Sequence, residues 1–294
     1  MFWQLLANGF VTGSVYAIAA IGVSLLYGLL RLVNFAHGDL MAFGAFVSYL
    51  ANVTFGLPMV LSLPAGMAAT AALALVSDLA LWRPLRLRRA GFMSLFLASI
   101  GVALVLRQMI LLLWGPQPRA YDVDPFKVYV IGDVRLSLAQ VATILVASAA
   151  IVAIALFLAR STTGRVMRAM ADDQALAQLS GIDVNRVILL TWVLAGLTAG
   201  LAGTLAALVQ GSFDPNFGFQ LLLPVFAAVV LGGIGSAYGA LAGGLALGVA
   251  TELSTWEGLA GGVEPAYKPV VAFGVLIVAL LVRPQGLFGR ARIV

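Results

Sequence analysis

The side chains that could catalyse a reaction or hold a phosphate group are few in this sequence. It contains one histidine, His37, two lysines, Lys127 and Lys268, and no cysteine. A phosphate-binding Walker loop needs Gly-Lys-Ser/Thr, and neither lysine stands in that context. A single histidine without cysteine can neither complete a zinc site nor supply a pair of groups for acid–base catalysis. These residue types argue against an enzyme and predict no metal, cofactor or ATP site in the chain itself.

Three charged residues stand inside otherwise apolar segments, where a charge is costly and is usually functional or paired. Arg107 and Glu252 lie toward the same end of their segments, and we hypothesise that they form an intramembrane ion pair. Asp78 lies close to the end of its segment. It is better explained as a partner of the basic residues that follow it.

A polar interruption, Arg-Leu-Val-Asn-Phe-Ala-His-Gly-Asp, separates two apolar runs at residues 31–39. It contains His37, and we expect this side chain to have a structural role near a helix end. The alternative is a pH-sensing or substrate-contact role.

The composition indicates that these residues are embedded in lipid. Of 294 residues, 62% are hydrophobic and 10% are charged, whereas soluble domains carry roughly 25% charged residues. Apolar runs of about 20 residues, the length that crosses a bilayer, recur along the whole chain. We therefore predict an all-α, polytopic membrane protein with one domain, residues 1–294, and about nine (eight to ten) crossings. The predicted crossings lie near residues 5–30, 40–55, 59–82, 92–114, 138–159, 187–210, 220–235, 237–256 and 268–282.

Basic residues gather in three stretches, and an even number of predicted crossings separates each stretch from the next. The positive-inside rule then places all three in the cytoplasm, with the carboxyl terminus inside and the amino terminus outside. Splitting the first segment into two short helices would give ten crossings and move the amino terminus inside. The net charge of +5 is thus explained by basic residues placed according to membrane topology, and it does not indicate nucleic-acid binding. The stretches are Arg83, Arg86, Arg88 and Arg89; Arg160, Arg165, Arg168 and Arg186; and Arg283, Arg290 and Arg292.

The longest predicted cytoplasmic stretch, within residues 160–186, has the pattern of a helix. Thr163 can cap its start and Gly181 suits the left-handed position at its end, while Asp183 can cap the crossing that follows. Such an insertion between two membrane helices indicates either a protein partner or a solvated helix.

Glycines indicate where helices pack and where they break. Residues 232–236, Gly-Gly-Ile-Gly-Ser, predict a tight hairpin or a re-entrant break between two crossings. Small residues spaced by four predict close helix packing, and sliding of these faces during gating is the alternative. The spaced glycines are Gly9 and Gly13; Gly196 and Gly200; Gly235, Gly239 and Gly243; and Gly244 and Gly248.

On the predicted outer side, apolar and polar residues alternate over residues 127–136, around a Gly-Asp pair. This pattern predicts a β-hairpin, which is a candidate docking element.

Taken together, several motifs make the chain resemble, nearly end to end, the smaller permease subunits of branched-chain amino acid ABC importers. Their order and spacing carry the resemblance. The motifs are Asn8-Gly9 with Gly13-Ser14-Val15-Tyr16-Ala17-Ile18; Tyr27-Gly28 with Asn34-Phe35-Ala36-His37-Gly38; Gly164-Arg165 with Arg168-Ala169, Asp172, Ala175 and Gly181-Ile182-Asp183-Val184; Pro215, Gly218, Leu231-Gly232-Gly233-Ile234-Gly235-Ser236, Gly239, Gly243-Gly244 and Glu252; and Arg283-Pro284-Gln285-Gly286-Leu287-Phe288-Gly289.

The resemblance implies a non-catalytic subunit in a bacterial inner membrane, one half of a translocation pathway for amino acids. It implies a second homologous permease, two cytoplasmic ATPase subunits that bind the ATP, and a periplasmic substrate-binding protein, with lipid as the solvent. It also implies that the cytoplasmic helix couples to the ATPase. The coupling residues would be Arg165, Arg168, Ala169, Asp172, Ala175, Gly181, Ile182 and Asp183.

Zwitterionic substrates favour helix ends and polar residues at a break, which selects candidate pathway residues. These are Asn8, Thr12, Asn34, His37, Gly232, Gly233, Gly235 and Ser236. Urea, short amides or aromatic acids are alternative substrates of the same type of importer. An ion-coupled secondary transporter is disfavoured because the inner halves of the crossings lack a cluster of carboxylates.

Overall fold

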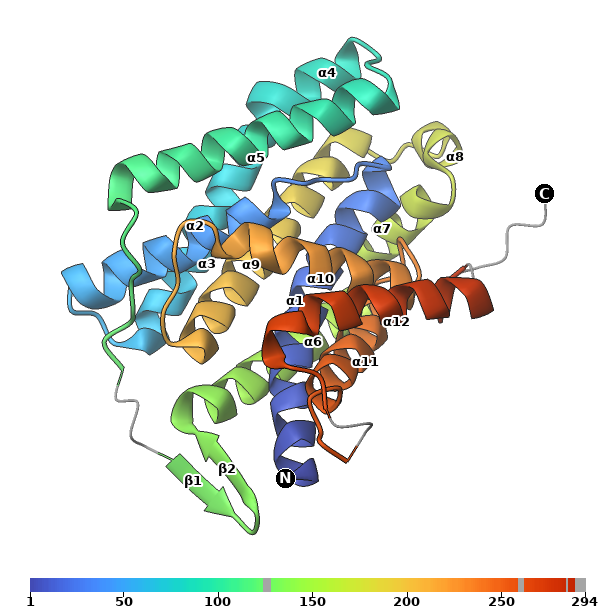
Figure 1. Ribbon diagram of the computed structural model, residues 1–294. Helices are drawn as coiled ribbons and strands as arrows, with labels where there is room; N and C mark the ends of the chain where they lie inside the picture. Colours follow the sequence, from blue (N-terminus) through green and yellow to red (C-terminus); the bar gives the residue numbers. More distant parts are fainter. Residues whose placement is uncertain (124–127, 259–261, 284, 289–294) are drawn as a thin grey trace.

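The computed structural model describes residues 1–123, 128–258, 262–283 and 285–288, and it is a bundle of helices with one small hairpin (Figure 1). Lys127, Pro284, Gly289, Arg290 and Arg292 lie outside the described residues. The helices are α1 (Phe2–Leu30), α2 (His37–Tyr49), α3 (Met59–Ser77), α4 (Arg83–Leu87), α5 (Phe92–Trp114), α6 (Leu138–Arg160), α7 (Thr162–Asp172), α8 (Gln174–Leu179), α9 (Val184–Gln210), α10 (Phe217–Gly232), α11 (Ala237–Leu253) and α12 (Lys268–Val282). Short π-helices at Leu50–Thr54 and Asp78–Trp82 extend α2 and α3, a 3-10 turn at Pro265–Tyr267 precedes α12, and β1 (Val128–Ile131) pairs with β2 (Val134–Ser137).

Each of the nine predicted apolar segments forms a helix. Within the described residues, six helical runs are long and apolar enough to cross a bilayer, at 2–30, 59–87, 92–114, 138–160, 184–210 and 265–282. The helices α10 and α11 are apolar but shorter. The chain is thus a multi-pass membrane protein, and the count of nine crossings stays a prediction. The first segment is one unbroken helix, α1, so the predicted alternative of two short helices is not observed.

Glycine-mediated contacts hold α1 and α9, the two most buried of the membrane-length helices, in the centre of the bundle. A Cβ added at Gly248 would collide with the backbone of Gly13, so α1 and α11 touch backbone to backbone. Between helices in lipid, such close van der Waals packing replaces the hydrophobic drive that operates in water. The spaced glycines predicted from the sequence therefore lie at helix contacts. Further contacts of this kind are Gly9 with Val249, Gly244 with Ala17, Gly196 with Ala71, Gly200 with Met67, and Gly243 with Ala228.

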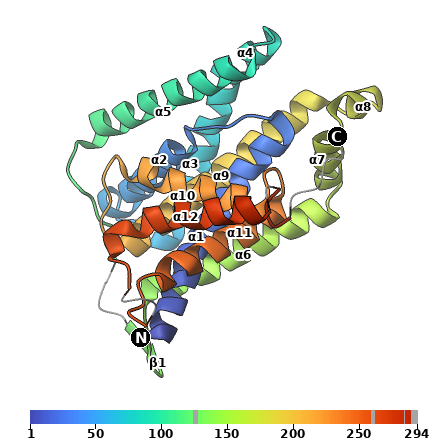
Figure 2. The ribbon, with the colours of Figure 1, turned by 45° about the vertical axis from the view of Figure 1, so that its right-hand side comes forward.

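The bundle has two chemically different ends. At the end called here the hairpin end, the start of α1 meets β2 through hydrogen bonds between Gln4 and Arg135, and Phe2 contacts Trp256. At the opposite end, the basic end, α7 and α8 lie far from the hairpin (Figures 1 and 2). The C-terminus of α1, with Arg31, meets the α10–α11 turn there. The predicted hairpin is confirmed, with the turn at Gly132 and Asp133.

A four-residue turn joins α10 and α11 at the basic end, as the glycine-rich sequence predicts. Gly233 and Gly235 have φ of 106° and 86°, a region that residues with a Cβ rarely adopt. The amide groups of Leu287 and Phe288 donate to the carbonyl oxygens of Leu231 and Gly232. These bonds satisfy the last acceptors of α10, which a helix end otherwise leaves without partners.

Replacing Gly248 by valine is expected to lower the melting temperature of the detergent-purified chain, because the added side chain meets the backbone of α1. Overpacking of this kind costs about 1–3 kcal/mol. The matched control is Gly101→Val in α5, where no atom lies within 4 Å of an added Cβ. Equal melting temperatures for the two variants would contradict the packing role of Gly248.

Candidate functional site

A cavity of about 610 Å³ lies at the basic end, where α1, α7 and the α10–α11 turn meet. It brings together two groups of residues that the sequence analysis assigned to different roles. Arg168 and Asp172 come from the predicted coupling segment, and Gly235 and Ser236 from the predicted pathway turn. The cavity therefore places the predicted coupling segment beside the predicted pathway turn.

The predicted cytoplasmic helix is in fact two helices, α7 and α8, separated at Asp173. The side chain of Asp173 accepts hydrogen bonds from the amides of Ala175 and Leu176, so it starts a new helix. The cap of α7 is Ser161 and not Thr163, because the Ser161 hydroxyl accepts from the Gly164 amide. A single helix across residues 163–181 was thus the wrong prediction for this segment.

Other local predictions for this segment are confirmed. Gly181 has a left-handed φ of 83°, and Asp183 caps α9 by accepting from the amide of Arg186. Arg168 donates to the carbonyl oxygen of Leu158 on α6, which ties α7 to the adjacent membrane helix.

The outer face of α7 and α8 is exposed, and it contains two apolar side chains that sequence reasoning missed. Leu176 is 62% exposed and Leu179 is 86% exposed. Two leucines four or fewer residues apart, in a stretch predicted to lie outside the membrane, are the sequence feature that could have revealed them. The predicted coupling residues on this exposed surface are Arg165, Arg168, Ala169, Asp172, Ala175, Gly181 and Asp183, while Ile182 is half-buried.

Asn34 and His37 lie inside the bundle and away from the cavity. His37 is fully buried, and its ring packs beside Gly22 of α1, which Thr198 of α9 also approaches. The Asn34 side-chain oxygen accepts from the amide of Ala36 and shapes the turn into α2. These contacts support the structural interpretation of His37.

Arg107 pairs with Asp39 of α2, and the predicted pair of Arg107 with Glu252 is wrong. Arg107 donates to both carboxylate oxygens of Asp39, at 3.0 and 3.2 Å. Its guanidinium also lies 4.5 Å from the ring centroid of Phe219. Depth along the membrane, on which the prediction relied, does not specify which helix stands beside α5. The predicted role of Asp78 is confirmed by its 2.7 Å ion pair with Arg86.

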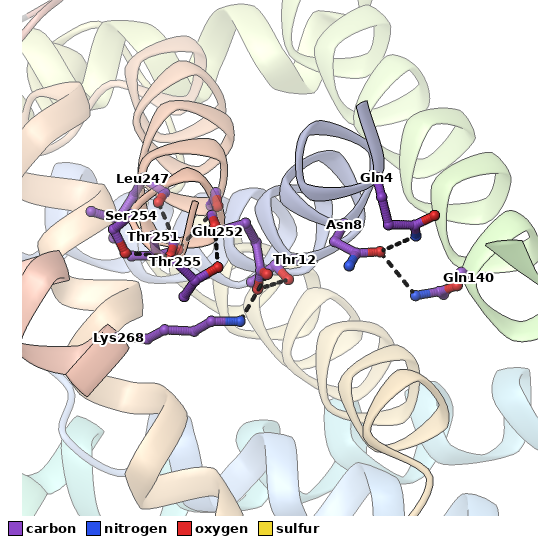
Figure 3. Close-up of polar contacts among 11 residues, drawn as sticks. Gln4, Asn8, Thr12, Gln140, Leu247, Thr251, Glu252, Ser254, Thr255 and Lys268 are labelled. Carbon is purple, nitrogen blue, oxygen red and sulfur yellow. Dashed lines mark hydrogen bonds and ion pairs between the residues drawn. The ribbon is translucent and has the colours of Figure 1, made fainter. Parts of the chain in front are cut away.

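Glu252 forms the centre of a polar group near the hairpin end (Figure 3). One carboxylate oxygen accepts from Lys268 at 2.8 Å, and the other accepts from the hydroxyl of Thr12 at 3.2 Å. One turn earlier on α1, the Asn8 side chain accepts from Gln4 and Gln140. The predicted pathway residues Asn8 and Thr12 therefore lie at the end of the bundle opposite to Gly235 and Ser236.

The fold and these sites define a multi-pass membrane protein that has polar groups at both ends and a buried ion pair between α2 and α5. Residues 5–280 match the family described as branched-chain amino acid transport system / permease component, and the chain belongs to this family. The family consists of transport permeases, so the prediction of a non-catalytic transport subunit is confirmed.

Two relatives come from Escherichia coli (strain K12). The high-affinity branched-chain amino acid transport system permease protein LivH is 33% identical over 305 residues, which cover 99% of this chain and 97% of LivH. Its counterpart LivM is 31% identical over 136 residues, which cover 46% of this chain and 30% of LivM. Among solved structures, PsaBC from Streptococcus pneumoniae matches with a TM-score of 0.50 and 16% identity, covering 97% of this chain and 94% of that chain. This last likeness concerns the fold alone.

A double-mutant cycle on Asp39→Asn and Arg107→Gln is expected to be strongly non-additive. Each single change leaves a charge buried without its partner, which costs about 3–5 kcal/mol, and the double change removes both charges. The measurement is the free energy of unfolding in detergent. The same cycle on Arg107 and Glu252, which bind different partners, is expected to add within about 0.5 kcal/mol. Coupling of Arg107 to Glu252, and none to Asp39, would contradict the observed pairing.

Proposed function

We propose that this chain is the transmembrane permease subunit of an ATP-driven importer of branched-chain or related neutral amino acids, and that it forms half of the translocation pathway. The near full-length similarity to LivH, a permease protein of a branched-chain amino acid transport system, supports the substrate class. The additional similarity to LivM, a second permease of the same bacterium, supports pairing with a homologous permease.

The observation that carries the proposal is the position of α7 between the exterior and the cavity. Met167 and Met170 are buried against the bundle, Arg168 and Asp172 line the cavity, and Leu176 and Leu179 of the following helix are exposed. The segment formed by α7 and α8 thus contacts the cavity on one side and has exposed leucines on the other. This arrangement suits coupling to a protein partner. We assign the ATPase subunits to this surface and the ATP to their sites.

The proposed orientation follows from the charges. Most described basic residues lie at the basic end, so this end is cytoplasmic by the positive-inside rule, with the carboxyl terminus inside and the amino terminus outside. The membrane is then the bacterial inner membrane. The hairpin end, with β1 and β2, faces the periplasm and receives the substrate-binding protein.

In the proposed cycle, closure of the ATPase dimer moves α7 and α8 as a rigid unit. Because Arg168 bonds to Leu158 of α6 and shares the cavity with Gly235 and Ser236, this movement changes the separation between α6 and the α10–α11 turn. Packed helices have discrete arrangements, so a small shift can switch the pathway between inward and outward openings.

Replacing Leu179 by alanine is expected to weaken binding of the ATPase subunits by about tenfold, which corresponds to roughly 1.4 kcal/mol. The reason is the loss of an 86% exposed apolar side chain from the proposed contact. Co-purification of the ATPase and substrate-stimulated ATP hydrolysis are the measurements. The control is Leu145→Ala in α6, where the leucine is 64% exposed on a membrane helix. Equal binding by both variants would contradict the assignment.

Reconstitution of the chain in proteoliposomes tests the proposed function as a whole. We expect ATP-dependent uptake of leucine, isoleucine or valine with the second permease, the ATPase subunits and the binding protein present, and none when the ATPase is omitted. Uptake driven by an ion gradient through the chain alone would contradict the proposal and indicate a secondary transporter.

A further inference from the structure

The ion pair of Glu252 and Lys268 places each charge at the unfavourable end of its helix. Glu252 is the penultimate residue of α11, and Lys268 is the first residue of α12. Helix C-termini favour cations and helix N-termini favour anions, because the aligned peptide dipoles sum along the axis. A pair that served stability alone would gain from the reverse placement. The helix dipoles therefore oppose both charges, and each charge gains from an additional group of opposite sign.

This pair borders the accessible strip of α1. Between Gly9 and Leu26, every residue of α1 is buried except Phe10, Thr12 and Tyr16. Phe10 points away from the other two, because two residues correspond to about 200° of rotation. Thr12 and Tyr16 are one turn apart on one face, and Thr12 donates to Glu252. A partly accessible polar strip on a central helix is suited to a substrate path.

The pair combines a sheltered anion with a reachable cation. The side chain of Glu252 is 10% exposed, and that of Lys268 is 32% exposed. The carboxylate uses its two oxygens for two donors, Lys268 and Thr12, so the loss of one donor leaves the other in place. A ligand that approaches from the side of Lys268 can thus separate the Glu252 carboxylate from the Lys268 ammonium group and bind to both.

We propose that Glu252, Lys268 and Thr12 form a binding site for the zwitterionic backbone of an α-amino acid, a deduction that rests on the proposed function. The substrate ammonium group takes the place of Lys268 on the Glu252 carboxylate, and the substrate carboxylate binds the displaced Lys268 ammonium. The Thr12 hydroxyl remains on Glu252 and fixes its orientation.

The charges explain which ligands this site accepts. A zwitterion inserted into a neutral pair leaves the site neutral, so no uncompensated charge is buried. An amino acid with a charged side chain adds a net charge, and urea or a short amide has no full charges with which to separate the pair. The site therefore selects neutral amino acids over the uncharged amides that remained an alternative on the sequence alone.

Protection of Lys268 from an amine-reactive, water-soluble reagent tests this site directly. The chain contains two lysines, so Lys127 serves as the internal control, and mass spectrometry of the purified permease–ATPase complex reports both. We expect saturating leucine to slow modification of Lys268 by about threefold or more and to leave Lys127 unchanged, because a bound carboxylate occupies the ammonium. Urea gives no protection, and Glu252→Gln abolishes protection by leucine. Modification of Lys268 that is indifferent to leucine would overturn the site.

Reversal of the pair separates a binding role from a structural one. The double variant Glu252→Lys with Lys268→Glu keeps an ion pair but inverts its direction relative to Thr12. We expect normal levels in the membrane and a fall in leucine uptake of about tenfold or more. The control is Glu264→Lys, a charge reversal at an exposed position shortly before α12, where uptake is expected to stay within about twofold of wild type.

The uptake measurements test the proposed zwitterion site separately from the proposed importer function. Uptake that stays at the wild-type rate after reversal of the Glu252–Lys268 pair would overturn the zwitterion site and leave the importer intact. Wild-type uptake that does not depend on ATP would overturn the importer, and the site with it.

Discussion

Backbone contact between glycine-faced helices is the constraint on which the rest of this structure depends. Lipid offers the helices no hydrophobic reason to associate, so they must approach closely enough for van der Waals packing to hold them. The collision that a side chain at Gly248 would make with Gly13 shows that α1 and α11 have reached this limit. Because packed elements of this kind do not deform gradually, we expect the proposed movement to occur between rigid groups of helices, at breaks such as the α10–α11 turn.

This packing limits the positions in the bundle at which polar side chains can lie. Asp39 and Arg107 are held against each other inside the bundle, where either alone would be an unpaired buried charge. The Glu252–Lys268 pair is partly accessible near the hairpin end, and the cavity beside α7 lies at the basic end. Polar chemistry at both ends with a packed centre is the arrangement expected of a pathway that opens to one side at a time.

The sequence predicted those features that depend on local chemistry. Apolar runs located every long helix, Gly233 and Gly235 located the turn, and Asp183 was recognised as a cap. The missed features depend on neighbours. The partner of Arg107 is set by packing of α5 against α2, 68 residues away in the chain, and the break at Asp173 arises because its side chain caps α8 instead of continuing α7. The cavity unites segments that no local pattern connects.

In the proposed orientation the basic end faces the cytoplasm, where an ATPase can reach α7 and α8, and the hairpin end faces the opposite side. Because the chain has no cysteine, single cysteines at Ser180 and Asp133, both exposed, can be labelled with a membrane-impermeant thiol reagent. We expect labelling of Asp133→Cys in intact spheroplasts, and of Ser180→Cys only in inside-out vesicles. Labelling of Ser180→Cys from the outside would contradict this orientation.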